Sequence, residues 1–276
     1  MSLLDYFKPV DTISPDELRK HMHRHDPADF ILLDVRQPAE YERGHLPGAV
    51  LMHVSTVAER QWELARDKPV FTYCAVGVRS RAAAAILKDA GFNARSLSGG
   101  INAWHGITAA GPPEAGMAYF TPAHGTGELI LLAWALEEGS RRFYSTLAKR
   151  EWDEDTTAVF TKLVEEEEQH KEKLEQFHAS IDAGALPVDR LAPGELGAVM
   201  EGGMRVEDAL RWLDDKNAGM ALQLALSLEV DSYDLYLKLE RRLEPAVDRR
   251  LFQGLARGEK AHIEMLAARL DQRLIE

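Results

Sequence analysis

Hydrophobic and polar positions follow two different patterns along this chain. In its first third, short apolar runs of strand length alternate with segments of helical pattern. Strands are expected at 30–33, 70–73 and 94–97, and helices at 15–23 and 81–90. This alternation predicts an α/β domain over residues 1–106, with a parallel sheet covered by helices.

The last part of the chain carries longer patterns in which apolar residues recur at helical spacing. Helices are expected at 126–149, 153–183, 206–216, 218–243 and 245–270. A long connection separates the second long helix from the third, which predicts an all-α four-helix bundle over residues 126–276. Residues 107–125 are rich in Gly, Pro and Ala and lack periodicity, so they are interpreted as a linker.

An internal repeat places metal-binding residue types on these helices. Glu167 and His170 lie three apart on one helix face, and the same pair recurs 92 residues later as Glu259 and His262 (259 minus 167, 262 minus 170). The same shift relates a further pair of acids and a pair of tyrosines. The candidate ligands are Glu137, Glu167, His170, Glu229, Glu259 and His262, with Tyr144 and Tyr236 beside them. Four carboxylates and two imidazoles suit two divalent cations.

Other interpretations of these residues remain open. Glu138 competes with Glu137 as the ligand of the first helix, although Val230 at the repeated position favours Glu137. The four acids at 165–168 resemble a solvated helix face, on which only Glu167 is paired with a histidine. The tyrosines either bond to carboxylates across the site or pack as core aromatics.

Composition narrows the functional classes. The chain has 276 residues, 45% hydrophobic and 28% charged, with a formal net charge of −12. The negative charge argues against nucleic acid or an anionic membrane as partner. A single cysteine, Cys74, excludes an internal disulfide and a cysteine-only metal site. With neither a signal-peptide pattern nor an apolar run of membrane length, the expected location is the cytoplasm.

Cys74 follows the strand at 70–73 and precedes a helix. A loop entering a helix directs backbone N–H groups inward and favours negative charge, so a thiol here should have a lowered pKa. Arg79 either adds positive charge at this loop or ties it to an acidic residue such as Glu40. The candidate binding loop comprises Ala75, Val76, Gly77, Val78 and Ser80.

The first hundred residues resemble the rhodanese (sulfurtransferase) family. The matching motifs, in order, are residues 34–36, 40–49, 74–80 and 97–104. The resemblance implies that Cys74 takes up sulfane sulfur from a small donor, thiosulfate or a persulfide, and passes it on as a persulfide. Four residues lie between Cys74 and Arg79, one fewer than the related phosphatases need to hold phosphate, so sulfur is favoured over an anion-binding phosphatase-like site. Asp34, Arg36 and His45 are interpreted as structural.

The last 150 residues or so resemble the rubrerythrin branch of the ferritin-like superfamily. The resemblance rests on the doubled pattern of Glu, a Tyr seven residues later, and Glu-x-x-His. It implies two iron ions, with manganese or zinc as alternatives, bridged by Glu167 and Glu259. The chain lacks the cysteine-rich rubredoxin domain of that branch and has Ser232 where many members carry an extra Glu. An external electron donor is therefore implied, and a homodimer is expected.

Two functions are consistent with these observations. The first is a persulfide sulfurtransferase joined to a di-iron redox domain that acts on peroxide, oxygen or the bound sulfur. The second is an iron-binding or oxidative-stress sensing protein whose rhodanese module is not catalytic. Loss of thiosulfate:cyanide sulfurtransfer in Cys74→Ser would favour the first.

Overall fold

The computed structural model describes residues 10–113, 126–181, 197–201, 203–242 and 249–273. The chain divides into two compact units, Met1–Glu114 and Ala115–Glu276, and each is described by itself. The strands of the first unit are β1 (Thr12–Ile13), β2 (Ile31–Asp34), β3 (Val50–Leu51), β4 (Val70–Tyr73) and β5 (Ala94–Leu97). They form a parallel sheet in the order β1-β5-β4-β2-β3.

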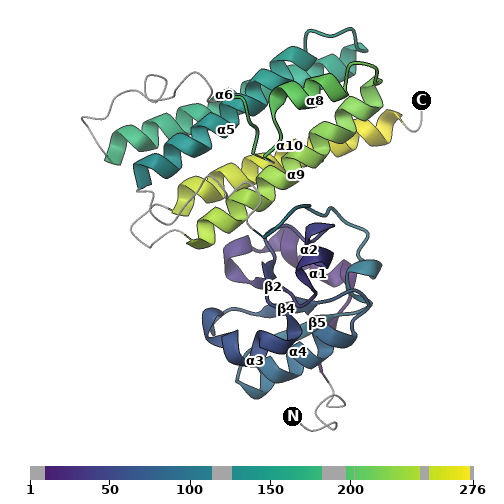
Figure 1. The fold of residues 1–276 in the computed structure, drawn as a ribbon, viewed down its shortest axis with the longest axis vertical. Helices are drawn as coiled ribbons and strands as arrows, with labels where there is room; N and C mark the ends of the chain where they lie inside the picture. The colour runs from purple at the N-terminus through teal and green to yellow at the C-terminus, as the bar shows by residue number, and fades with distance from the viewer. Residues whose placement is uncertain (1–9, 114–125, 182–196, 202, 243–248, 274–276) are drawn as a thin grey trace. The chain divides into compact units, whose positions relative to one another are not determined.

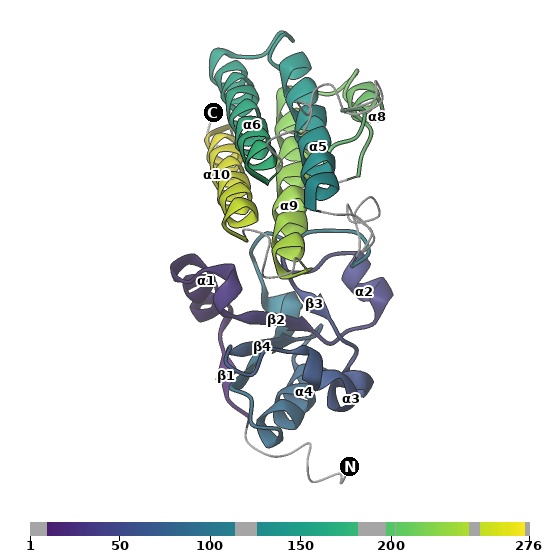
Figure 2. The same ribbon diagram turned by 90° about the vertical axis from the view of Figure 1, so that its left-hand side faces the viewer.

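Helices cover both faces of this sheet. They are α1 (Pro15–Arg24), α2 (Pro38–Glu42), α3 (Val57–Arg60) and α4 (Val78–Asp89), with 3-10 turns at Pro27–Asp29, Val54–Thr56, Gln61–Glu63 and Gly100–Ala103. One face packs against α3 and α4 through residues such as Leu33 and Leu87. The other packs against α1 and α2 through Leu18, Tyr41 and Tyr73. Figure 2 shows α3 and α4 on one side of the sheet and α1 on the other. The central strand β4 is thus buried on both faces, as parallel sheets require.

The second unit is helical in its described residues. Its helices are α5 (Thr126–Leu147), α6 (Glu154–Ile181), α8 (Val206–Trp212), α9 (Ala218–Arg242) and α10 (Arg249–Arg273). Helices α5 and α6 lie side by side, as do α9 and α10, and α10 also contacts α6 (Figure 1). Their shared core contains Phe143, Tyr144, Phe160, Leu222 and Leu266. No described helix is long and apolar enough to cross a membrane.

The sequence-based helices and strands agree with the structure apart from their ends and a few short elements. The expected start at Pro245 and the end near residue 183 lie outside the described residues, as do positions 114–125 of the expected linker. The earlier linker residues return to the α/β unit, because Ala109 pairs with His45 and the Gly111 N–H donates to the Glu42 carbonyl. The strands and α-helices that were not predicted are β1, β3, α2 and α3, which are at most five residues long.

Candidate functional site

The six candidate ligands of the helical unit all lie together in its interior. Glu137 comes from α5, Glu229 from α9, and the two Glu-x-x-His pairs from α6 and α10; each is at most 2% exposed. Their ligand atoms form two groups within which all atoms lie within 4.8 Å of one another. The groups are Glu137, Glu167, His170, Glu259 and Glu167, Glu229, Glu259, His262. Glu167 and Glu259 belong to both, which is the arrangement expected of carboxylates shared by two ions.

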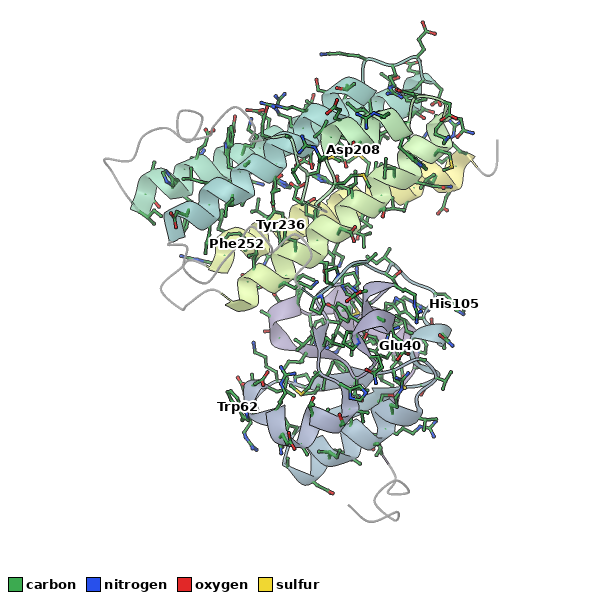
Figure 3. The ribbon with its side chains drawn as sticks, viewed as in Figure 1. Glu40, Trp62, His105, Asp208, Tyr236 and Phe252 are labelled. Carbon is green, nitrogen blue, oxygen red and sulfur yellow. The ribbon has the colours of Figure 1, made fainter. Side chains whose placement is uncertain are left out.

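The contacts inside this cluster repeat with the sequence repeat. His170 Nδ1 lies 3.3 Å from a Glu137 oxygen, and His262 Nδ1 lies 2.9 Å from a Glu229 oxygen. The Tyr144 hydroxyl on α5 donates to Glu229 on α9. In the reciprocal contact, the hydroxyl of Tyr236 on α9, labelled in Figure 3, donates to Glu137 on α5. Each half of the repeat therefore supplies a tyrosine that holds a carboxylate of the other half, Glu229 or Glu137.

The orientation of the imidazoles and the buried charge show that this cluster suits cations. Both histidines face the carboxylates through Nδ1, and a Glu167 oxygen is buried without a hydrogen-bond partner among the described residues. Burial, together with the charge of Glu137, raises the pKa of Glu167 well above its usual value. Burial also raises the pKa of Glu229 to about 8, despite the opposing effect of His262. Carboxylates this costly to ionise without counter-charge fit two divalent cations.

The rival residues on the same helices face other partners. Glu138 pairs with Arg141, Arg142 and Lys171, which outweigh its burial and lower its pKa to about 2. The side chain of Glu165 is 61% exposed and contacts Lys162, as expected for a solvated face. Ser232 is buried, and its hydroxyl donates a hydrogen bond to the Leu228 carbonyl within α9.

One buried acid next to this cluster was not predicted. Glu201, in the connection between α6 and α8, is 2% exposed, and the hydroxyl of Ser140 on α5 donates to it. Its neighbourhood has no helical periodicity, and the 92-residue repeat has no counterpart for it. The available signal was a single acid between Met200 and two glycines, a charged residue in an apolar context.

In the α/β unit, Cys74 lies at the carboxyl end of the central strand β4, at the entrance to α4. The intervening loop turns at Gly77, whose φ of 98° is in the left-handed region that favours glycine. The Gly77 N–H donates to Cys74 Sγ at 3.1 Å, and the Ser80 hydroxyl lies 3.6 Å from the same sulfur. The side chains of Val76 and Val78 are 58% and 67% exposed, so the loop presents its backbone to the sulfur.

These donors determine the charge state of the thiol. Burial by itself would raise the pKa of Cys74, which is 1% exposed. The amide and hydroxyl of Ser80 and the amide of Gly77 stabilise the thiolate, and the net effect lowers the pKa below its ordinary value of 9.0. The loop therefore favours an anionic sulfur at this position.

Arg79 forms the ion pair with Glu40 that the sequence analysis gave as one of its two possible roles. Its guanidinium forms a bidentate pair with Glu40 of α2, at 2.7 and 2.8 Å (Figure 3 labels Glu40). This pair lowers the pKa of Glu40 to about 2. The Cys74 sulfur also acts on Arg79, so the side chain both ties the loop to α2 and places positive charge near the thiol.

Asp34, Arg36 and His45, which the sequence analysis interpreted as structural, make contacts that hold the surrounding segments. Asp34 pairs with Arg36, which also donates to the Gly44 carbonyl. His45 is fully buried, with Nδ1 3.0 Å from the Tyr41 carbonyl and its ring stacked on the Tyr41 ring. These contacts fix the segment after α2 that forms one wall of the site.

A cavity of about 420 Å³ opens beside the Cys74 loop. Its lining contains two arginines and the loop residue Ala75. The full set is Arg36, Glu40, Arg43, Gly44, Ala75, Ile101, Asn102 and Thr108. The cavity has the size and the cationic groups to admit a small anion next to the loop.

Comparison with known proteins identifies this α/β unit. A family model described as a rhodanese-like domain matches residues 14–107. A sulfurtransferase from Allochromatium vinosum is 37% identical over 106 residues, which cover 37% of this chain and 97% of that protein. The chain belongs to the rhodanese-like family. The resemblance inferred from the motifs is therefore confirmed for the N-terminal unit.

Other relatives of the rhodanese-like unit match to different extents. The thiosulfate sulfurtransferase GlpE of Pseudoalteromonas translucida is 34% identical over 80 residues, covering 29% of this chain and 76% of that protein. Two further curated relatives are longer than the region that matches. The chain spans 60% of the length of one and 42% of the length of the other. The crystal structure of a rhodanese-related protein from Thermoplasma volcanium matches with 28% identity and a TM-score of 0.33, covering 36% of this chain and 97% of that one.

The electrostatics of the rhodanese-like loop predict a pH profile for Cys74 alkylation. Because its pKa is lowered, the thiolate is present above the shifted value and is lost only when the pH falls below it. The rate of reaction with iodoacetamide should therefore reach half its maximum below pH 9.0. Ser80→Ala, which removes a donor to the sulfur, should move this midpoint upward. A wild-type midpoint at or above 9.0 would contradict the assignment of the loop amides as thiolate donors.

Proposed function

We propose that this chain is a sulfurtransferase that carries sulfane sulfur on Cys74. The thiolate attacks the outer sulfur of a donor such as thiosulfate; the new S–S bond forms as the old one breaks, and sulfite leaves with the bonding electron pair. A thiophilic acceptor, cyanide in the standard assay, then takes the terminal sulfur and regenerates the thiolate. The observation that carries this proposal is the loop that surrounds Cys74 Sγ with N–H and hydroxyl donors.

The neighbouring cavity supports a small anionic donor. Arg43 and Arg36 line it, and Ala75 connects it to the loop that holds the nucleophile. The persulfide formed on Cys74 carries a negative charge on its terminal sulfur, and the same amides and the nearby Arg79 guanidinium stabilise that charge. The relatives from Allochromatium vinosum and Pseudoalteromonas translucida are both named sulfurtransferases, which agrees with this chemistry.

The proposal is tested by mass spectrometry of the intact chain after exposure to thiosulfate. Wild type should gain the mass of one sulfur atom, lose it on addition of cyanide, and produce thiocyanate on each turnover. Cys74→Ser should show neither the adduct nor turnover, while Ser55→Ala, an exposed position outside the loop, should behave as wild type. A wild-type protein that forms no adduct would overturn the assignment and favour a non-catalytic sensing module.

For the helical unit, we propose a ferritin-like four-helix bundle of the rubrerythrin type that holds two iron ions. Support comes from the repeated contacts of six buried candidate ligands and from the unpartnered Glu167 oxygen among them. Bound iron would supply redox chemistry toward peroxide, oxygen or sulfane sulfur. The chain's own residues hold the ligand set in place: Tyr144 and Tyr236 orient the carboxylates of Glu229 and Glu137. The external electron donor, the homodimer and the cytoplasmic location are part of the same proposal.

Metal content provides the test of this second part. The full chain, stripped of metal and reloaded anaerobically with Fe²⁺, should hold two ions per chain. Glu167→Gln removes a carboxylate shared by both groups and should reduce the content below one ion at the same free concentration. Glu165→Gln, two residues earlier on an exposed face, should retain two. A wild-type chain that retains no iron, manganese or zinc would contradict the proposed centre.

A further inference from the structure

A fifth buried carboxylate lies beside the proposed metal centre. Glu201 belongs to the connection between α6 and α8 and is 2% exposed. One of its oxygens accepts a hydrogen bond from the Ser140 hydroxyl. The other, Oε1, is buried with no hydrogen-bond partner among the described residues. A buried carboxylate oxygen left in this state is costly unless another group meets it.

The backbone around Glu201 is packed tightly against α5. A Cβ at Gly139 would lie 2.2 Å from the Val199 carbonyl oxygen, so the glycine permits a close approach that any side chain would block. Residues after Val199 turn back on themselves, since Val199 pairs with Arg205 and the Met200 N–H donates to the Met204 carbonyl. This turn directs Glu201 inward toward α5.

The hydrogen bond with Ser140 places Glu201 at the part of α5 that carries Glu137, three residues before Ser140. After burial, the charges with the largest effect on its carboxyl group are those of Glu137 and Glu259. Its own charge acts on both Tyr144 and Tyr236. Ser140, which holds its other oxygen, follows Glu137 by one turn of α5. Glu201 is outside both close groups of ligand atoms, and its contact with Ser140 places it on the side of Glu137, which belongs to only one of the two groups.

We propose that Glu201 is a seventh protein ligand of the metal centre and binds the ion on the Glu137 side. The inference rests on the proposed di-metal function and extends it. The 92-residue repeat that relates the other six ligands would place a counterpart at Ala109, which belongs to the rhodanese-like unit. Glu201 therefore has no repeat-related counterpart at the other ion, so the two ion positions would differ in their number of carboxylate ligands.

Titration of the metal-free full chain with Mn²⁺, followed by calorimetry and by electron paramagnetic resonance, tests this ligand. Wild type should bind two ions with unequal affinities. Glu201→Gln is close to isosteric. It should lower the affinity for one ion by at least about tenfold, as loss of a supporting group at a metal site does, and leave the affinity for the other unchanged. Glu201→Asp keeps the charge but shortens the side chain, so it should weaken the binding of the same ion. Glu165→Gln should match wild type.

Each other outcome has a distinct meaning. Two ions bound by Glu201→Gln with wild-type affinities would overturn the ligand role and leave the di-metal proposal standing. Weakening in Glu201→Gln but not in Glu201→Asp would assign Glu201 an electrostatic effect and also overturn it. Failure of wild type to bind Mn²⁺, Fe²⁺ or Zn²⁺ would overturn the di-metal function itself. Thermal unfolding of the metal-free variants checks that each variant is folded before its metal affinities are compared.

Discussion

Gly258→Ala is expected to destabilise the metal-free helical unit by about 1–3 kcal/mol, the range for an overpacked core. A Cβ at position 258 would lie 2.1 Å from His170 Nε2 and 2.5 Å from Cε1. The His170 ring has little room to retreat, since it is fully buried and its Nδ1 faces the Glu137 and Glu259 carboxylates at 3.3 and 3.1 Å. Either the ring or α10 must move.

The same movement should separate the proposed ligands. Glu259 is the next residue on α10, so a shift of the helix or of the His170 ring pulls apart two members of one ligand group. Metal affinity should fall by at least about tenfold, comparable to the loss of a group that orients a ligand. Calorimetric Mn²⁺ titration measures this loss, and thermal unfolding of the metal-free chain measures the destabilisation.

Gly254→Ala is a matched control one turn earlier on the same helix. No described atom lies within 4 Å of a Cβ built at that position. Alanine is favoured over glycine in a helix interior by up to about 1 kcal/mol, so this variant should be slightly more stable and bind metal as wild type does. Equal behaviour of the two variants would show that helix propensity, and not the His170 contact, governs position 258.

The strands and helices that carry both sites could be predicted from local patterns of apolar and polar residues. Strand β5 was predicted with its observed ends, and the loop from Cys74 to Ser80 was assigned from its place between a strand and a helix. β1 and β3 are only two residues long, too short for any periodicity to reveal. Their pairing depends on sheet neighbours far away in the sequence, for example Thr12 beside Ser96.

The candidate metal residues were found because the chain repeats itself. A shift of 92 residues marks six ligands and two tyrosines together, although no single pair would have been specific. The reciprocal bonds of Tyr144 and Tyr236 needed the structure, because the spacing alone left open whether the hydroxyls bond to carboxylates across the site or the rings only pack in the core. Glu201 escaped the sequence analysis because it occurs once, in a segment positioned by tertiary packing against Gly139.

Gly100→Ala is expected to lower the rate of sulfur transfer by about 100-fold, the effect of misplacing a reacting group by roughly 1 Å. Gly100 has a φ of 62°, which L side chains rarely adopt. Its Cβ would lie 2.2 Å from the Cys74 carbonyl oxygen and 2.6 Å from the Ala75 carbonyl carbon. These are backbone atoms of the nucleophile's own loop, so they cannot move without displacing the sulfur.

The hydrogen bonds around this contact extend the effect into the site. The Ile101 N–H donates to the Cys74 carbonyl at 2.8 Å, and the Asn102 N–H donates to the Ala75 carbonyl at 3.1 Å. Ile101 and Asn102 also line the cavity beside the loop. A methyl group at position 100 would therefore strain these bonds and alter the donor cavity as well as the nucleophile. Thiosulfate:cyanide kinetics, with separate kcat and KM, record both effects.

Gly91→Ala separates backbone strain from displacement of the loop. Gly91 also has a positive φ, of 91°, but the nearest described atom to its added Cβ is an Arg66 side-chain nitrogen at 3.8 Å. This variant should lose about 1–2 kcal/mol of stability from the left-handed backbone and keep the wild-type rate of sulfur transfer. If Gly91→Ala slowed transfer as much as Gly100→Ala, general destabilisation would account for the loss. A selective loss in Gly100→Ala would identify the backbone contact with Cys74 as what holds the sulfur in place.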